Sequence, residues 1–164
     1  MKPADLAAIL LEFHKDKLTL RQRHVAVAKK VSDYNANNTY QYVINREDLH
    51  LSWLEAALAE LDATPAVVPE PPLPSLVWNE SFIPLVSKDA ADAGAFVQAW
   101  RPRVDAITHA RHRSMLGVIL GETLEQKRFF DQIAAGRQDE LGRRANGPGS
   151  PGTGDGVLGV RWIE

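Results

Sequence analysis

Apolar residues recur at helical spacing in four stretches of the chain, and each stretch predicts one amphipathic helix. The first begins at Pro3 and Asp5, which suit the first turn of a helix, and ends at the turn formers of residues 32–38. The second is expected from about Thr39 to Leu61. The apolar positions are Leu6, Ile9, Leu10, Phe13, Leu20, Val27 and Val31 in the first stripe, and Tyr40, Val43, Ile44, Leu51, Leu54, Leu58 and Leu61 in the second. The short loop between them predicts an antiparallel hairpin.

The third and fourth stretches predict a second hairpin. Ser87 and Asp89 indicate an N-cap and an acidic first turn, and Pro102 should bend or interrupt the third helix. The sequence shows no clear turn between the two helices. The break is expected at residues 109–114. The stripes are Ala93, Phe96, Val97, Trp100, Val104 and Ile107 in the third helix, and Met115, Val118, Ile119, Glu122, Gln126, Phe129, Phe130 and Ile133 in the fourth.

Residues 63–87 differ from the helices that flank them, because their six prolines forbid a continuous helix. The apolar residues between these prolines argue against a free linker, so we expect a strap that runs along the bundle. Residues 1–141 are therefore predicted to form an all-α, four-helix up-down bundle, in which this Pro-rich crossover joins two antiparallel hairpins. Residues 142–164, rich in glycine and proline, are expected to form a C-terminal arm.

The composition removes several classes of function. The chain has 164 residues, a formal net charge of -2 and no cysteine, so it carries no basic footprint for nucleic acid and cannot form thiolate metal sites or disulfides. No apolar run approaches the ~20 residues of a membrane span, and the N-terminal residues lack the pattern of a signal peptide. We expect a cytoplasmic protein without a nucleic-acid or membrane partner. A homo-oligomer is expected, with a dimer through the helices or through the C-terminal arm as alternatives.

Polar residues on the inner stripes carry the candidate chemistry. Glu47 and His50 lie three positions apart on the second helix, so their side chains can reach one point in space. The same face carries the apolar stripe, which directs the pair toward the core. A carboxylate and an imidazole need partners there, because burying them unpaired is costly. In helical bundles a metal ion is the usual partner.

Two hairpins joined by a long crossover, with Glu47-x-x-His50 followed by Trp53-Leu54-Glu55, resemble the ferritin-like superfamily, including its rubrerythrin and bacterioferritin branches. The resemblance covers roughly residues 4–140 and is specific at this motif. It implies a di-iron or di-manganese centre, held by two Glu-x-x-His motifs and two single glutamates. Such a centre would react with oxygen or peroxide, as an oxidase, a peroxidase or an iron-handling protein does.

The resemblance carries over to this chain only in part. Glu125 stands where the fourth-helix motif would have its histidine, and His14 stands near the place of the first-helix carboxylate, with Glu12 two residues away. The candidate metal ligands are Glu47, His50, Glu122, Asp89, Glu125 and His14. Because both departures weaken the site, a pair of iron or manganese ions, a single ion and a metal-free core all stay open.

Lys17 offers an alternative to the metal, because it lies nearer the centre of the first stripe than His14 does. An ammonium group among Glu47, Glu122 and Asp89 would neutralise charge where relatives place metal. The chain would then be a metal-free ferritin-like bundle that acts as a binding or assembly module. A third hypothesis is a pocket that holds a small organic ligand between polar and aromatic groups.

Three further hypotheses concern single features. Asp105, His109 and His112 are spaced to share one helical face, expected at the solvent, and would offer a weak chelate for a divalent ion. His24 lies on the first stripe and is expected to be a hydrogen-bonded core residue. Glu47 could also be an exposed acid paired with Arg46, which would contribute little to stability.

Overall fold

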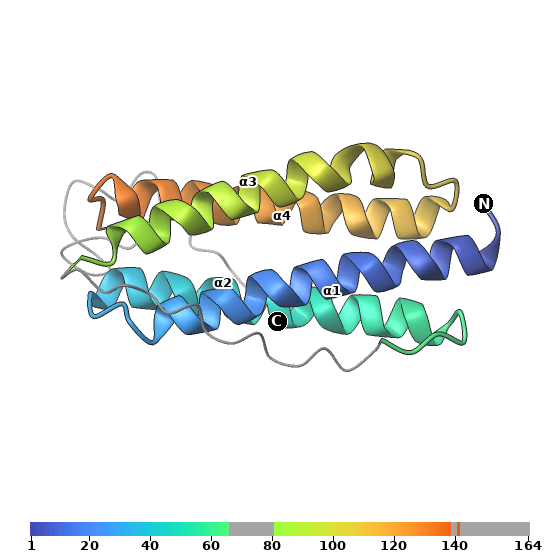
Figure 1. Ribbon diagram of the computed structural model, residues 1–164, viewed down its shortest axis with the longest axis horizontal. Coiled ribbons are helices and arrows are strands. Elements are labelled where there is room, and N and C mark those ends of the chain that lie inside the picture. Colours follow the sequence, from blue (N-terminus) through green and yellow to red (C-terminus); the bar gives the residue numbers. More distant parts are fainter. Residues whose placement is uncertain (66–80, 139–140, 142–164) are drawn as a thin grey trace, which may run out of the picture.

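The computed structural model of the protein describes residues 1–65, 81–138 and 141. These residues form four helices and no strand. The helices are α1 (Pro3–Ala28), α2 (Tyr34–Ala59), α3 (Ile83–Asp105) and α4 (Ala110–Ala134). The first two pack as one antiparallel hairpin and the last two as another, with α1 beside α3 and α2 beside α4 (Figure 1). The predicted all-α four-helix bundle is confirmed.

The directions of the helices require a long connection in the middle of the chain. In Figure 1, α1 and α4 run one way along the bundle, and α2 and α3 run the other way. Since α2 ends at one end of the bundle and α3 begins at the other, the chain between them must span the bundle's length. Most of the predicted crossover, residues 66–80, lies outside the described residues, as does the predicted C-terminal arm of residues 142–164.

The second helix begins about five residues earlier than its sequence predicts, because a side chain caps it. Asp33 is the N-cap, and its carboxylate accepts a hydrogen bond from the backbone N–H of Ala36 at 2.8 Å. Asn37 donates to the carbonyl oxygens of Ala28 and Val31, where α1 has ended. The turn formers of this region therefore lie partly in the first turn of α2, so the predicted start near residue 39 was wrong.

The third helix also begins earlier than predicted, at residue 83 rather than near 87. Pro84 lies in its first turn, where a missing N–H removes no helical hydrogen bond. Ser87 and Asp89 are therefore inside the helix, and the N-cap assigned to Ser87 was wrong. Pro102 lies in the last turn of α3, and the break before α4 falls at residues 106–109, slightly before the expected 109–114.

Two apolar clusters fill the bundle, one toward each end. One surrounds Phe13, Trp100 and Leu120, and the other surrounds Tyr40 and Phe130. On α2 and α4 the buried polar side chains of Glu47, His50, Thr123 and Gln126 fall between the two clusters, whereas Asp89 of α3 lies within the second cluster. A fully buried apolar side chain contributes about 1.5–3 kcal/mol to stability. The two clusters therefore offset the cost of burying the polar side chains.

The buried stripes of all four helices largely match their predictions, but the stripe of α4 differs in its first half: Ile119, Gln126, Phe129, Phe130 and Ile133 are buried as expected, whereas Met115, Val118 and Glu122 are not. Leu116, Leu120 and Thr123 are buried on α4, but Val118 is 50% exposed. The apolar residues at the surface of α4 misled the prediction. Glu122 consequently lies at the edge of the buried stripe and not in its middle.

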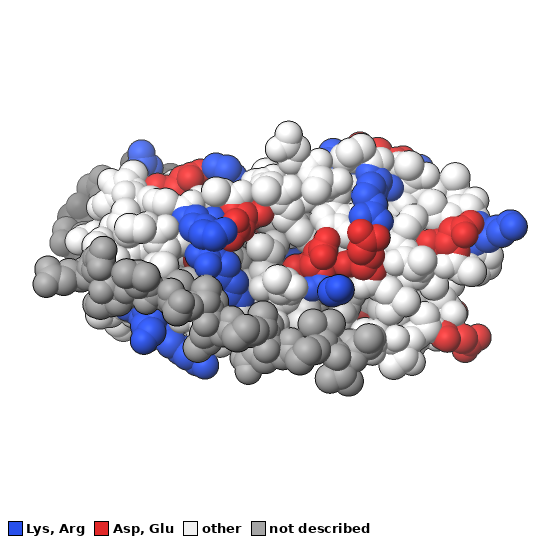
Figure 2. All heavy atoms as spheres, viewed as in Figure 1, with Lys and Arg blue, Asp and Glu red and all other residues white. Residues whose placement is uncertain are grey.

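The surface carries charges of both signs. On the face shown in Figure 2, acidic and basic side chains lie interspersed over the helices. None of the four helices combines the length and the apolar character that a membrane-spanning segment requires.

Candidate functional site

Three carboxylates lie at or beside the polar centre of the bundle, one from each of three helices. Glu47 on α2 and Asp89 on α3 are fully buried, and Glu122 on α4 is partly exposed. Each accepts hydrogen bonds from one cationic side chain and one further side chain. The polar centre therefore consists of three anchored carboxylates.

Glu47 is held by two residues of α1. The ammonium of Lys17, also fully buried, donates to Oε1 of Glu47 at 2.8 Å, and Nδ1 of His24 lies 2.8 Å from Oε2. Lys17 Nζ also lies 3.3 Å from Thr123 Oγ1 and 3.2 Å from Gln126 Oε1, both on α4. An ammonium has three donors, so all of them have acceptors. Lys17 therefore ties α1 to α2 and to α4.

Two opposing effects act on the Glu47 carboxyl. Burial raises its pKa, but the nearby charges and the hydrogen bonds of His24 and Lys17 outweigh burial and lower the pKa to about 2. Glu47 is therefore ionised at neutral pH. A buried ion pair of this kind adds little net stability, although losing one partner is strongly destabilising.

Asp89 is held at the interface of α1, α2 and α3. Arg23 Nε of α1 donates to Oδ1 of Asp89, and the Tyr40 hydroxyl of α2 donates to Oδ2, both at 2.5 Å. Arg23 also donates to the carbonyl oxygen of Leu85 at 3.3 Å. Burial raises the pKa of Asp89 against the opposing effects of His24, Tyr40 and Arg23. Burial likewise raises the pKa of the Tyr40 hydroxyl, so this group stays a donor.

Glu122 is held by two residues of α2. Arg46 donates to it from Nε at 2.9 Å and from Nη2, and Nε2 of His50 lies 2.8 Å from Oε2. Burial and the charge of Lys17 lower the pKa of His50, so its ring is neutral at neutral pH. Burial raises the pKa of Glu122, but Arg46 and His50 outweigh it and keep this carboxyl ionised. A carboxylate only accepts, so the ring proton of His50 lies on Nε2.

The six candidate ligands from the sequence lie in different places. Glu47 and His50 both point into the bundle, and His50 contacts Glu122. Glu47 is fully buried and Arg46 pairs with Glu122, which excludes the hypothesis of an exposed Glu47–Arg46 pair.

The other three candidates have separate partners. Asp89 pairs with Arg23, as described above. His14 is buried with its Nε2 3.4 Å from Glu55, and Glu125 is exposed and pairs with Arg128. Lys17 contacts Glu47 as the alternative hypothesis supposed, but Asp89 and Glu122 are held by two arginines.

The arrangement of these side chains does not fit a di-iron or di-manganese centre. In the described part of the chain, no group of three or more His, Cys, Asp or Glu side chains could hold a metal ion. Both oxygens of Glu47 already have partners, and the Lys17 ammonium, 2.8 Å from one of them, would repel a divalent cation. A metal at this place would have to displace Lys17.

The chelate expected from Asp105, His109 and His112 does not form on one helical face. Asp105 ends α3, whereas His109 is the N-cap of α4 and His112 lies in its first turn. The two rings face each other with Nδ1 atoms 2.8 Å apart, so one donates and the other accepts. His112 is buried, contrary to its expected place at the solvent, and burial lowers its pKa.

Several residues that build the polar centre were not assigned a role from the sequence. These residues are Arg23, the hydroxyl of Tyr40, and Thr123; Arg46 was considered only as a partner of Glu47. The available signal was weak: Arg23 and Arg46 each stand beside a residue of the inner stripe, which places their long side chains within reach of the interior.

Comparison with protein-family models, with curated proteins and with solved structures gave no match to this chain. Its function therefore has to be argued from the side chains described above.

Proposed function

We propose that this protein is a metal-free bundle of the ferritin-like kind, in which Lys17 stands where relatives hold a metal, and that it serves as a binding module. The observation that carries this proposal is the fully buried Lys17 ammonium, which donates to Glu47, Thr123 and Gln126. Like a metal ion, this ammonium places a positive charge among oxygen atoms of two helices, α2 and α4.

The balance of charge supports the proposal. The three carboxylates of the polar centre face three cations, Lys17, Arg23 and Arg46, before any histidine is counted. Arg23 also contacts Asp92, whose charge is balanced by Lys88. Adding a divalent ion would leave two surplus positive charges in a largely buried region, and an uncompensated buried charge costs several kcal/mol. A bound metal would therefore require the loss of an existing cation.

The order and direction of the helices support the ferritin-like part of the proposal. The end of α2 and the start of α3 lie at opposite ends of a bundle of two antiparallel hairpins, and hairpins that need one long connection are typical of ferritin-like folds. Fold alone does not give function, so the binding role rests on the site: the centre is closed by paired charges, and a pocket opens beside it between α2 and α4.

Metal analysis tests the metal-free part of this proposal directly. Protein purified without chelator and then incubated anaerobically with Fe(II) or Mn(II) should retain far less than one metal per chain after desalting. Its thermal midpoint should be the same with and without chelator, because the Lys17–Glu47 pair needs no metal. Near-stoichiometric iron or manganese, together with a lower thermal midpoint after chelation, would overturn the proposal.

A further inference from the structure

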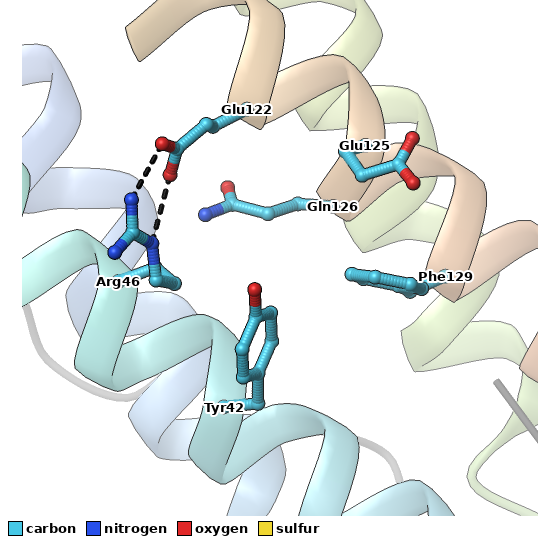
Figure 3. A pocket seen from close by; sticks show the side chains of 6 residues that line it. All are labelled: Tyr42, Arg46, Glu122, Glu125, Gln126 and Phe129. Atoms are coloured by element: carbon cyan, nitrogen blue, oxygen red, sulfur yellow. Dashed lines mark hydrogen bonds and ion pairs between the residues drawn. The ribbon is translucent and has the colours of Figure 1, made fainter. Parts of the chain in front are cut away.

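A pocket of about 220 Å³ lies between α2 and α4, beside the polar centre. Two of its residues, Glu122 and Gln126, also belong to the hydrogen-bond network of that centre. Figure 3 shows side chains of both helices pointing toward the same space. The pocket is lined by Tyr42, Arg46, Glu122, Glu125, Gln126 and Phe129.

The amide of Gln126 provides unused donors at this pocket. The side chain is only 2% exposed, its Oε1 accepts from Lys17 at 3.2 Å, and its Nε2 has no hydrogen-bond partner among the described residues. Because an ammonium can only donate, Lys17 fixes the amide with its oxygen toward the ammonium, which leaves the nitrogen without a partner in the described part of the chain. Figure 3 shows this amide extending from α4 toward α2. A buried donor without an acceptor costs about 1–3 kcal/mol, which an acceptor on a ligand would remove.

The charges that line the pocket are already paired. Arg46 binds Glu122 at 2.9 Å, and Arg128 binds Glu125 at 3.0 Å. An anion would approach two carboxylates, and a cation would approach Arg46. The lining therefore favours an uncharged molecule, and the carboxylates keep free lone pairs that can accept from a neutral N–H.

The aromatic residues indicate the shape of the ligand. The rings of Tyr42 and Phe129 lie 5.9 Å apart between centroids, at 83° to each other, and Arg128 lies over Phe129 at 5.0 Å. Tyr42 is 45% exposed, so its ring offers a surface on which a flat molecule can stack. The pocket is smaller than the ~300–1,000 Å³ of sites for drug-sized ligands, which limits its occupant to about one ring.

We propose that this pocket binds an uncharged, single-ring heteroaromatic molecule with an amide or lactam edge, the chemistry that a pyrimidine base and nicotinamide share. The ring stacks on Tyr42, the carbonyl oxygen accepts from Nε2 of Gln126, and the N–H of the same edge donates to Glu122 or Glu125. The inference deepens the binding role proposed above and rests on it, because the orientation of Gln126 depends on Lys17.

The experiment is a ¹⁵N-edited NMR titration of the full chain with uracil and, separately, with nicotinamide, which distinguishes the two sources of this edge. Benzoate and benzylammonium are the charged controls. We expect at least one neutral probe to cause saturable chemical-shift changes of the Gln126 side-chain NH₂ and of the Tyr42 and Phe129 backbone amides. Benzoate and benzylammonium should bind at least tenfold more weakly. Absence of saturable shifts with both neutral probes, or equal binding of benzoate, would overturn the inference.

Two variants locate the binding. Gln126→Leu removes the donors and Tyr42→Leu removes the stacking surface, and each should weaken binding of the neutral probe at least tenfold. Tyr42 lies at the surface, so Tyr42→Leu still tests the proposal if Gln126→Leu does not fold. Gln98→Leu, an exposed glutamine of α3, is the matched control and should bind as the unmodified protein does. Wild-type affinity in the Tyr42→Leu variant would refute the assignment.

The two proposals can fail separately. If neither neutral probe binds and the protein takes up no metal, the proposed ligand is wrong. The proposal that Lys17 replaces a metal then still stands. Stoichiometric uptake of iron or manganese overturns the proposed function whatever the probes do.

Discussion

A buried ammonium such as that of Lys17 persists only while its acceptors hold it, because the interior solvates an unpaired charge poorly. Replacing Lys17 by methionine keeps most of the side-chain volume but leaves Glu47 with His24 alone. We expect Lys17→Met to lower the free energy of unfolding by about 3–5 kcal/mol, the usual cost of breaking a buried ion pair. Urea denaturation followed by circular dichroism measures this change.

The controls separate the ion pair from the general effect of losing a lysine. Lys15→Met changes an exposed residue of the same helix and should shift stability by no more than about 0.5 kcal/mol. The double variant Lys17→Met, Glu47→Leu should recover part of the loss, because an apolar pair can replace a buried ion pair. A single variant as stable as the unmodified protein would show that the ammonium does not hold Glu47.

The carboxyl of Glu47 predicts a specific dependence of stability on pH. Its pKa falls from 4.5 to about 2 on folding, so the folded state favours the ionised form. This contribution is fully present above pH ~4.5 and is lost as the pH falls toward 2. The difference in unfolding free energy between the unmodified protein and Glu47→Gln should therefore shrink over this window.

Asp89 makes this comparison necessary, since its effect has the opposite sign. Burial raises the pKa of Asp89, so its contribution is present at low pH and is lost as the pH rises through the folded-state pKa. Subtracting the two urea-denaturation profiles cancels Asp89. A difference that stays constant from pH 5 to 2.5 would contradict the assigned ionisation of Glu47.

Helical periodicity is sufficient to place single residues inside the bundle but not to pair them. Lys17, His24 and Glu47 fall on inner stripes in the sequence and are fully buried in the structure. Their partners could not be predicted, because each pairing joins different helices and depends on how those helices rotate. Arg23 and Arg46 enter from the edges of their stripes on long side chains, a reach that spacing along one helix does not describe.

The sequence patterns predicted the number and type of the helices correctly but placed several helix ends wrongly. Asp and Asn residues favour both turns and the first turn of a helix, so the polar stretch at residues 32–38 had two interpretations. Pro84 similarly had two, because proline breaks a helix in its interior and suits its first turn. Contacts with the rest of the bundle decide between such alternatives.

The N-cap of α2 can be tested by substitution. Asp33→Ala removes the acceptor of the Ala36 N–H and should lower the free energy of unfolding by about 1 kcal/mol. Asp33→Asn is the matched control, because asparagine caps a helix about as well as aspartate does. Thermal and urea denaturation measure both variants. Equal stability of the alanine and asparagine variants would mean that the first turn of α2 does not depend on this cap.

The polar centre joins all four helices of the bundle. Lys17 of α1 reaches α2 and α4, Arg23 of α1 reaches α3, and Arg46 of α2 reaches α4. The sequence predicted that polar residues of different helices would meet in the interior. It could not predict that three separate ion pairs would form there, because this depends on the relative positions of the four helices.

If Lys17 stands at the place of a metal, changing its charge should restore a need for one. Lys17→Glu would set a second carboxylate against Glu47 with no cation between them, and like charges buried together are strongly unfavourable. We expect this variant to be much less stable than the unmodified protein in chelator, and to gain stability with Mn(II) or Co(II). A metal at 100 times its dissociation constant adds about 2.7 kcal/mol, a shift that thermal denaturation detects readily.

The comparison that decides this point is Lys17→Gln, which removes the positive charge without adding a negative one. Its thermal midpoint should not respond to either metal, because a neutral amide supplies too weak a donor to attract a divalent ion between Glu47 and α4. If only Lys17→Glu is stabilised by metal, the Lys17 ammonium of the natural chain occupies the position of a metal ion. No response in either variant would mean that the place of Lys17 cannot hold a metal, and equal responses would mean that the metal binds independently of the charge at position 17. The ferritin-like interpretation of the polar centre would then lose its main support.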